Sequence, residues 1–242
     1  MKENYENRTR YFLPRRTYTI IRLDGKAFHT FTRGMKRPFD EDFMTVMDNT
    51  AKFLCEEIQG AKAAYVQSDE ISILLVDFDK ITTDAWFDGN IQKMVSVAAS
   101  IATAKFNALF NYDKDSSQRT MAFFDARVFT IPDPVEVENY FVWRQKDAVR
   151  NSIAMTAQSL YSHKQLEGVT QVGMQDLIVE KGQNWNDLPA GFKRGRTISP
   201  KDLVIGPDGP YYSYCGGWVI ITPDFLKERE VFKEIIPRII YE

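Results

Sequence analysis

The sequence predicts an α+β fold, an antiparallel sheet backed by helices, on the strength of three observations. Four short apolar stretches rich in β-branched residues have the length of strands. Two longer stretches carry apolar residues at helical spacing. Their order, strand–helix–strand–strand–helix–strand, is that of the ferredoxin-like topology. The expected strands are 18–23, 62–68, 71–77 and 121–131, and the expected helices are 40–59 and 90–110.

The first strand and the first helix have clear ends. The strand at 18–23 stops at Asp24-Gly25, a dipeptide typical of turns. The segment 26–39 that follows has no periodic pattern and is expected to be irregular. Asp40 is a good N-cap, because its carboxylate can accept a hydrogen bond from a free amide in the first helical turn. Gly60 suits the end of the same helix.

The second and third strands are separated only by Ser68-Asp69-Glu70, which predicts a tight hairpin with acids at its tip. A right-handed crossover would place the strand that ends at Ser68 beside the first strand. Asp24 and Asp69 would then face each other across a cleft. Two carboxylates and the carbonyl of Gly25 suit a hard divalent cation, above all Mg2+.

The second half of the chain is less regular. Pro132 and Pro134 end the fourth strand, and a third long helix is expected at about 135–161. We predict two parts, a palm-like catalytic domain with a basic N-terminal arm at 1–135 and a C-terminal part packed on it at 136–242. The features expected in the C-terminal part are a basic turn at 191–196, a hairpin region at 211–222 and a terminal helix at 225–236.

Composition excludes several classes of protein. No apolar run approaches the ~20 residues of a membrane span, and the N-terminus lacks the apolar core of a secretion signal. Cys55 and Cys215 follow no motif spacing, which favours a reduced, cytoplasmic protein. His29 and His163 are too few and too isolated for a zinc site. The sequence has no phosphate-binding glycine loop.

Charge is distributed unevenly. The net charge is −2, yet residues 1–37 carry ten Lys and Arg against three Asp and Glu, and the rest carries 21 against 30. This asymmetry indicates either a basic face over an acidic body or a solvated N-terminal arm.

The acids and cations together suggest phosphoryl chemistry. Two Mg2+ ions ~3.5–4 Å apart can activate an attacking hydroxyl and stabilise a leaving pyrophosphate. Asp24 and Asp69 are the candidate catalytic acids, and the alternative is two surface turn acids. Glu70 could bind a metal, orient a ligand or cap the turn, and we favour an indirect role. His29 could stack on a base or form a hydrogen bond with it, and the alternative is a hydrogen-bonded loop histidine. Candidate phosphate-binding cations, each alternatively a solubilising group, are Lys26, Lys36, Arg37, Lys93, Lys105, Arg150, Lys193 and Arg194.

Several short motifs occur together. They are Arg22-Leu-Asp-Gly-Lys-Ala-Phe-His29, Arg37-Pro-Phe-Asp40, Gln67-Ser-Asp-Glu-Ile-Ser72, Trp143-Arg-Gln-Lys-Asp147, Arg150-Asn-Ser152 and Gly191-Phe-Lys-Arg-Gly195. In this combination the chain resembles the tRNA-His guanylyltransferase superfamily, in particular its guanylyltransferase-like branch of 3′–5′ RNA polymerases. The resemblance runs from about Tyr11 to Gly195 and implies a ferredoxin-like polymerase palm.

The resemblance also implies a site and its partners. Two Mg2+ would be bound by Asp24, the Gly25 carbonyl and Asp69, with Glu70 close by. The implied partners are tRNA and nucleoside triphosphates such as GTP and ATP, and the implied assembly is a homotetramer. The nucleotide-binding positions are Lys26, His29, Arg37, Asp40, Ser68 and Asn151, and those near the triphosphates and RNA are Lys93, Arg150, Lys193 and Arg194.

One stretch departs from the family. Eukaryotic members carry His-Ile-Asn-Asn where this chain has Val149-Arg-Asn-Ser152. The departure favours the branch that rebuilds truncated tRNA 5′ ends by copying the opposite strand. The alternatives are a tRNA-His guanylyltransferase proper, a palm-fold nucleotide cyclase and a non-catalytic RNA-binding module.

Overall fold

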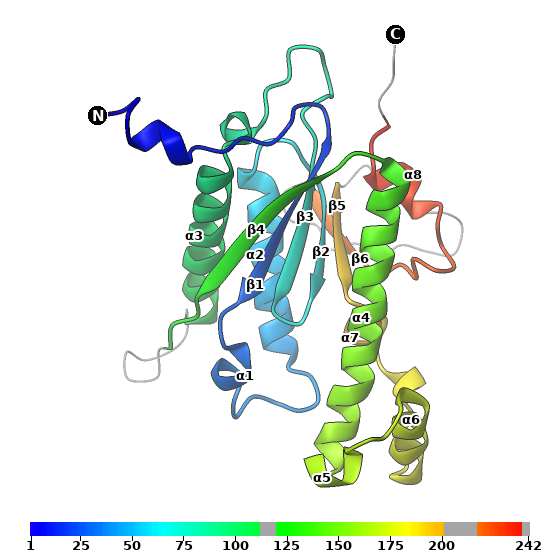
Figure 1. Ribbon diagram of the computed structural model, residues 1–242. Helices are drawn as coiled ribbons and strands as arrows, with labels where there is room; N and C mark the ends of the chain where they lie inside the picture. Colours follow the sequence, from blue (N-terminus) through cyan, green and yellow to red (C-terminus); the bar gives the residue numbers. More distant parts are fainter. Residues whose placement is uncertain (112–119, 201–216, 239–242) are drawn as a thin grey trace.

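The computed structural model describes residues 1–111, 120–200 and 217–238. Strands and helices follow in the predicted order (Figure 1). The strands are β1 (Tyr18–Gly25), β2 (Ala61–Gln67), β3 (Glu70–Leu75), β4 (Phe124–Ile131), β5 (Arg196–Pro200) and β6 (Trp218–Ile221). The helices are α1 (Phe28–Phe31), α2 (Glu41–Glu57), α3 (Ile91–Phe110), α4 (Pro134–Leu160), α5 (His163–Leu166), α6 (Gln171–Glu180), α7 (Ala190–Arg194) and α8 (Val231–Ile235). Short 3-10 turns are η1 (Glu6–Thr9), η2 (Trp86–Gly89) and η3 (Trp185–Asp187).

The strands form one six-stranded sheet in the order β4-β1-β3-β2-β5-β6, and the paired strands are antiparallel. The predicted neighbour of β1 was wrong. β1 pairs with β3, which begins at Glu70, and not with β2, which ends at Gln67. The crossover through α2 therefore places β2 one strand away from β1, and the hairpin brings β3 back between β1 and β2.

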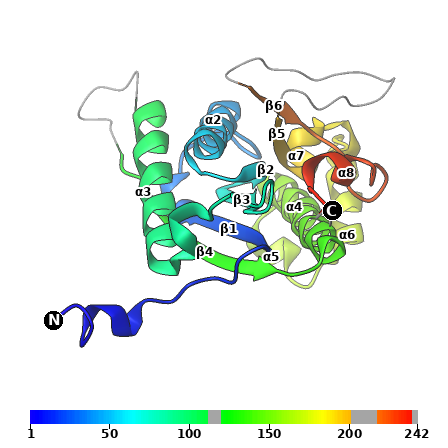
Figure 2. The ribbon, with the colours of Figure 1, turned by 90° about the horizontal axis from the view of Figure 1, so that it is seen from above.

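Helices cover both faces of the sheet (Figure 2). α2 and α3 cover one face, where the buried side chains include Met47, Leu54 and Phe106. α4 and α8 cover the other face, where Tyr18, Phe141 and many other apolar side chains are buried. The sheet is thus the middle of three layers, and its strands are apolar because both faces are covered.

Local signals explain where the long helices begin. The Asp40 carboxylate accepts a hydrogen bond from the Phe43 amide at 2.9 Å, which confirms the predicted N-cap of α2. Asn90 caps α3 in the same way, through the Lys93 amide at 3.0 Å. Pro134 occupies the first turn of α4, where its missing amide costs no hydrogen bond.

The C-terminal part extends the same sheet. β5 and β6 pair with each other and join the sheet through β2, so the predicted boundary at 135 falls between strands that belong to one sheet. The terminal helix is shorter than predicted and spans Val231–Ile235. Positions 211–216 of the expected hairpin, and Cys215, lie outside the described residues. In the described residues no helix is both long and apolar enough for a membrane span.

Candidate active site

A cavity of ≈ 650 Å³ opens at the end of the sheet where β1 stops and the β2–β3 hairpin turns. Its walls are the end of β1, α1 and the loop before α2, the hairpin, one side of α4 and the α7–β5 segment. The predicted site residues that line it are Asp24, Gly25, His29, Lys36, Arg37, Asp40, Ser68, Asp69 and Asn151. The fold therefore brings Asp24 and Asp69 and the predicted nucleotide-binding positions other than Lys26 to one place.

The charge of Asp24 acts on Asp69. The pKa of Asp69 is raised from 3.8 to about 6, chiefly by burial and in part by the nearby charge of Asp24, while hydrogen bonds from a backbone amide and from the Ser68 side chain oppose the rise. Ser68 itself has a φ of +47°, in the left-handed region that side chains other than glycine seldom adopt. The hairpin thus holds Asp69 close to a like charge in a strained turn, a combination found at functional sites.

Gly25 is required for a packing reason that the sequence did not reveal. A Cβ atom at this position would lie 2.3 Å from a ring carbon of Phe28. Phe28 is buried and packs against Phe31, Phe43, Phe106 and Phe124. The aromatic cluster therefore presses directly on the backbone beside Asp24.

The oxygen donors around Asp24 and Asp69 fit Mg2+. This ion prefers oxygen ligands and is held by one or two carboxylates, while phosphates and water complete its shell. Among the described residues no group of three or more His, Cys, Asp or Glu side chains could hold a metal ion. A cation bound at this pair would therefore depend on further oxygens, such as those of a bound phosphate.

Other lining residues have additional roles. Asp40 uses one carboxylate oxygen to cap α2 and accepts the Lys36 amide on the other at 3.1 Å. His29 and Arg37 are exposed in the cavity wall. The Asn151 amide donates to Asp147 at 3.4 Å. Asp40 therefore shapes the loop that carries Arg37, whatever it contributes to a ligand.

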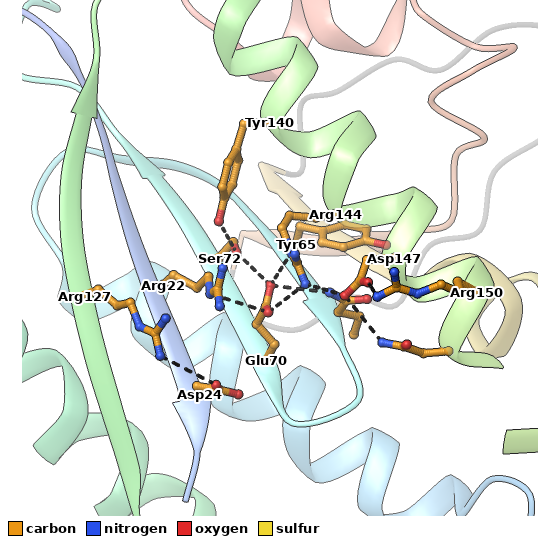
Figure 3. A network of polar contacts seen from close by, with 12 residues as sticks. Arg22, Asp24, Tyr65, Glu70, Ser72, Arg127, Tyr140, Arg144, Asp147 and Arg150 are labelled. Carbon is orange, nitrogen blue, oxygen red and sulfur yellow. Dashed lines mark hydrogen bonds and ion pairs between the residues drawn. The ribbon is translucent and has the colours of Figure 1, made fainter. Parts of the chain in front are cut away.

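Glu70 does not line the cavity. Its two oxygens accept hydrogen bonds from Arg144 Nε and Nη2 at 2.8 and 2.9 Å, and Arg22 Nε lies 3.5 Å from Oε2 (Figure 3). Only 8% of the residue is exposed. The indirect role favoured from the sequence agrees with this position, whereas its direct catalytic role stays a prediction.

The predicted triphosphate and RNA contacts also lie outside the cavity wall. Lys93 faces the ring of Phe87, and Arg150 forms an ion pair with Asp147. Lys193 donates to the Asn186 carbonyl at 2.5 Å. Arg194 pairs with Asp224 at 3.1 Å, and Lys26, next to Gly25, is exposed. A role in triphosphate or RNA binding stays a prediction for the first four, and a role in nucleotide binding stays a prediction for Lys26.

Two arginines near the site were not named as site residues from the sequence, although one of them, Arg196, ends the predicted basic turn. Arg127 lies opposite Arg22 in the β1–β4 pairing, and its Nη2 is 3.9 Å from Asp24 Oδ2 (Figure 3). Arg196 lines the cavity, pairs with Asp48 at 2.7 Å and keeps its buried Nη2 without a hydrogen-bond partner. Arg127 follows no acidic turn or basic run, and only the pairing of β4 with β1 reveals it. Arg196 belongs to the predicted basic turn at 191–196, but only the fold shows that its partner is Asp48 of α2.

Comparisons with known proteins identify the family of the chain. A family model described as tRNAHis guanylyltransferase matches residues 1–132. An uncharacterized protein of Acanthamoeba polyphaga mimivirus is 30% identical over 229 residues, covering 84% of this chain and 76% of its own. A bacterial tRNA(His) guanylyltransferase-like protein, solved in complex with ATP, is 44% identical and has a TM-score of 0.86 over 97% of both chains. Another, in complex with GTP, is 39% identical and has a TM-score of 0.77 over 97% of both chains.

The resemblance inferred from the motifs is thereby confirmed. The family model covers more than half of the 242 residues, and the structural match extends along nearly the whole chain. The chain belongs to the tRNA(His) guanylyltransferase family, with a likeness to its guanylyltransferase-like branch, and is a nucleotidyltransferase.

Proposed function

We propose that this protein is a template-dependent 3′–5′ nucleotidyltransferase that adds nucleotides to the 5′ end of tRNA and releases pyrophosphate. The observation that carries the proposal is the convergence of Asp24, Gly25 and Asp69 with His29 and Arg37 on one cavity. The βαββαβ sheet that presents these acids is, in this proposal, a polymerase palm. The bacterial relatives solved with ATP and GTP support nucleoside triphosphates as ligands.

The predicted site residues that line the cavity have distinct tasks in this reaction. Two Mg2+ ions held by Asp24, the Gly25 carbonyl and Asp69 would activate the sugar 3′-hydroxyl and offset charge on the departing pyrophosphate. Arg37 offers a guanidinium that can bind two phosphate oxygens at once. His29 of α1 and Asn151 of α4, which both line the cavity, would contact the nucleoside. The β2–β3 turn holds Asp69 and the end of β1 holds Asp24, so positioning requires little reorganisation on binding.

Template dependence is supported by the region that departs from the eukaryotic motif. Ser152 lines the cavity, yet its hydroxyl accepts a hydrogen bond from Trp185 Nε1 at 3.0 Å and donates to backbone carbonyls of Val149 and Lys193. A side chain so engaged is poorly placed to select one base. Pairing with the opposite RNA strand would supply base choice, and the protein would read shape and backbone.

The proposal includes a homotetramer that acts in the cytoplasm, so that RNA could span several subunits. A tetramer would also gather the basic residues of several N-terminal segments despite a net charge of −2 per chain. Sedimentation of the purified protein with and without tRNA tests this part of the proposal.

The decisive experiment is a 5′ extension assay. The protein is incubated with Mg2+, labelled nucleoside triphosphates and several tRNAs that lack the first nucleotide, with and without ATP to activate a monophosphorylated end. We expect the nucleotide complementary to the opposite strand to be added to more than one tRNA. Addition of G to tRNA-His alone, without regard to the opposite base, would indicate a dedicated guanylyltransferase. A cyclic nucleotide formed without RNA would indicate a cyclase, and Mg2+-independent RNA binding without pyrophosphate release would indicate a binding module.

A further inference from the structure

A series of polar contacts leads from the β2–β3 hairpin to the side of α4 that lines the cavity (Figure 3). Glu70 receives two hydrogen bonds from Arg144, at 2.8 and 2.9 Å. Arg144 Nη2 also donates to Asp147 Oδ2 at 2.8 Å. Asp147 Oδ2 in turn accepts the Asn151 amide at 3.4 Å. Residues from β3 and α4 are thereby joined without a gap.

The charge of Glu70 is compensated inside the protein. Arg144 and Glu70 are 5% and 8% exposed. Arg22 adds a second positive charge, and the Ser72 hydroxyl lies 3.4 Å from Glu70 Oε1 and 2.8 Å from the Tyr140 hydroxyl. A carboxylate held by a two-pronged guanidinium in a buried setting has a fixed orientation. Glu70 is therefore held toward α4, while its neighbour Asp69 lines the cavity.

The two ends of this series belong to different walls of the cavity. Asp69 precedes Glu70 directly in the hairpin, and Asn151 lies about two turns beyond Arg144 on α4. A shift of Arg144 would therefore move Asp69 in the hairpin relative to Asn151 on α4. Displacements of about 1 Å at such a site can cost on the order of 100-fold in rate.

We propose that Glu70 and Arg144 are positioning residues, which set the placement of Asp69 relative to Asn151 and bind neither metal nor nucleotide. The inference rests on the proposed function, since it assigns these tasks to Asp69 and Asn151. Asp147 is the next member of the series, because it joins Arg144 to Asn151. The exposed Arg150 pairs with Asp147 at the edge of the series.

A double-mutant cycle in the full-length protein tests the inference. The variants are Glu70→Gln, Arg144→Gln and the two combined, with kcat and KM for the incoming nucleoside triphosphate measured in the extension assay. We expect each single change to lower kcat about 10- to 100-fold, as for residues that orient metal ligands, with a smaller change in KM. The double variant is expected to be no worse than the poorer single variant, because both changes break one contact.

The conservative variant Arg144→Lys adds an independent check. Lysine keeps the positive charge but cannot bind Glu70 with two prongs. We expect a kcat between those of the wild type and Arg144→Gln, with a melting temperature near that of the wild type. A kcat equal to that of Arg144→Gln in a folded protein would still fit a geometric role, whereas a wild-type kcat would overturn it.

Asp77→Asn is the matched control. Asp77 is also buried and pairs with an arginine, Arg15, at 2.6 Å, but it does not line the active-site cavity. We expect this variant to lose thermal stability while keeping kcat within about 2-fold, since the contact lies outside the site. An equal loss of kcat in Asp77→Asn would mean that Arg144 acts only through global stability.

Calorimetric titration with Mg2+ and ATP provides a readout besides turnover. If Glu70 binds metal directly, Glu70→Gln weakens Mg2+ binding whereas Arg144→Gln does not, and this result overturns the inference. If both variants weaken Mg2+·ATP binding to the same extent and without additivity, the inference is supported. A wild-type protein that extends no tRNA rejects the proposed function, and the titration cycle then decides the positioning role by itself.

Discussion

Asp24 lies directly opposite Glu70 in the pairing of β1 with β3, so the two carboxylates project from the same face of the sheet. Their surroundings differ. Glu70 is buried against Arg144 and Arg22, whereas Asp24 lines the cavity, and its ion pair is the long contact with Arg127, at 3.9 Å. The charge of Glu70 is thus compensated by arginines of the protein, whereas the charge of Asp24 is available to a ligand. Four predictions follow from this and related contacts.

The first prediction concerns Asp69→Asn. The pKa of Asp69 is raised to about 6 from 3.8, so its proton is held more tightly in the folded state. The stability that the folded protein gains from protonated Asp69 is therefore complete below about pH 4 and is lost as the pH rises through about 6. Without Mg2+, we expect Asp69→Asn to melt about 2–4 °C above the wild type at pH 7.5, corresponding to ~1 kcal/mol, and to have no extension activity.

Melting curves at pH 4.5 and pH 7.5 check the sign of this effect. The difference between variant and wild type should shrink at the lower pH, where the wild-type carboxyl is protonated. Mg2+ should raise the melting temperature of the wild type and not that of Asp69→Asn. A variant that is less stable at pH 7.5, or still active, contradicts the two-acid account.

The second prediction concerns the strained turn at Ser68. A left-handed conformation costs roughly 1–2 kcal/mol for a residue with a side chain, and glycine avoids this cost but loses more entropy on folding. We expect Ser68→Gly to gain about 0.5–1 kcal/mol in the free energy of unfolding, measured by urea denaturation. Activity should fall, because the hydrogen bond that lowers the pKa of Asp69 is removed.

Ser68→Asn is the control for this turn. Asparagine tolerates the left-handed region and offers a polar side chain near Asp69. It should retain more activity than Ser68→Gly at similar stability. Equal activities of the two variants would show that the Ser68 side chain has no role in holding Asp69.

Local features of the site could be predicted from the sequence, because they depend on neighbours along the chain. The Asp40 cap needs only the amide of Phe43, three residues on, and the hairpin needs only apolar strands around Ser68-Asp69. The contacts of Glu70 could not be predicted in this way. Arg144 is 74 positions away in the sequence, and nothing near either residue indicates the partner.

The contacts of the basic turn at 191–196 could not be predicted for the same reason, since the partners are distant in the sequence. From the sequence, Lys193 and Arg194 are candidate phosphate-binding cations or else solubilising groups. In the structure Arg194 pairs with Asp224, and Arg196 of the same turn pairs with Asp48, which is 148 positions away in the sequence. A run of charged residues can be recognised in the sequence, but the exposure of its side chains depends on which segments pack beside it. Gly25 is a related case, because the ring that excludes its side chain is Phe28, and only α1 brings that ring back over the strand.

The third prediction concerns Gly25→Ala. Its Cβ would meet the Phe28 ring at 2.3 Å, and the ring is fixed by four other phenylalanines. We expect a loss of about 1–3 kcal/mol in the free energy of unfolding and a large loss of activity, because overpacking displaces the backbone beside Asp24. In Gly34→Ala, where a Cβ meets nothing within 4 Å, the φ of +92° alone is strained. That variant should remain active, and an inactive one would show that the loop tolerates no change.

The fourth prediction concerns the ion pair between Arg196 and Asp48, which ties β5 to α2 beside the cavity. Each side chain is about 5% exposed, and burial raises the pKa of Asp48 despite the attraction of Arg196. Removing one partner leaves a buried charge, so Asp48→Leu and Arg196→Met should each cost about 3–5 kcal/mol. The double variant should be more stable than either single variant, because two apolar side chains need no compensation. Urea denaturation of the wild type, the two single variants and the double variant measures the coupling free energy between Asp48 and Arg196. If the losses in the free energy of unfolding simply add, the two charges do not stabilise each other.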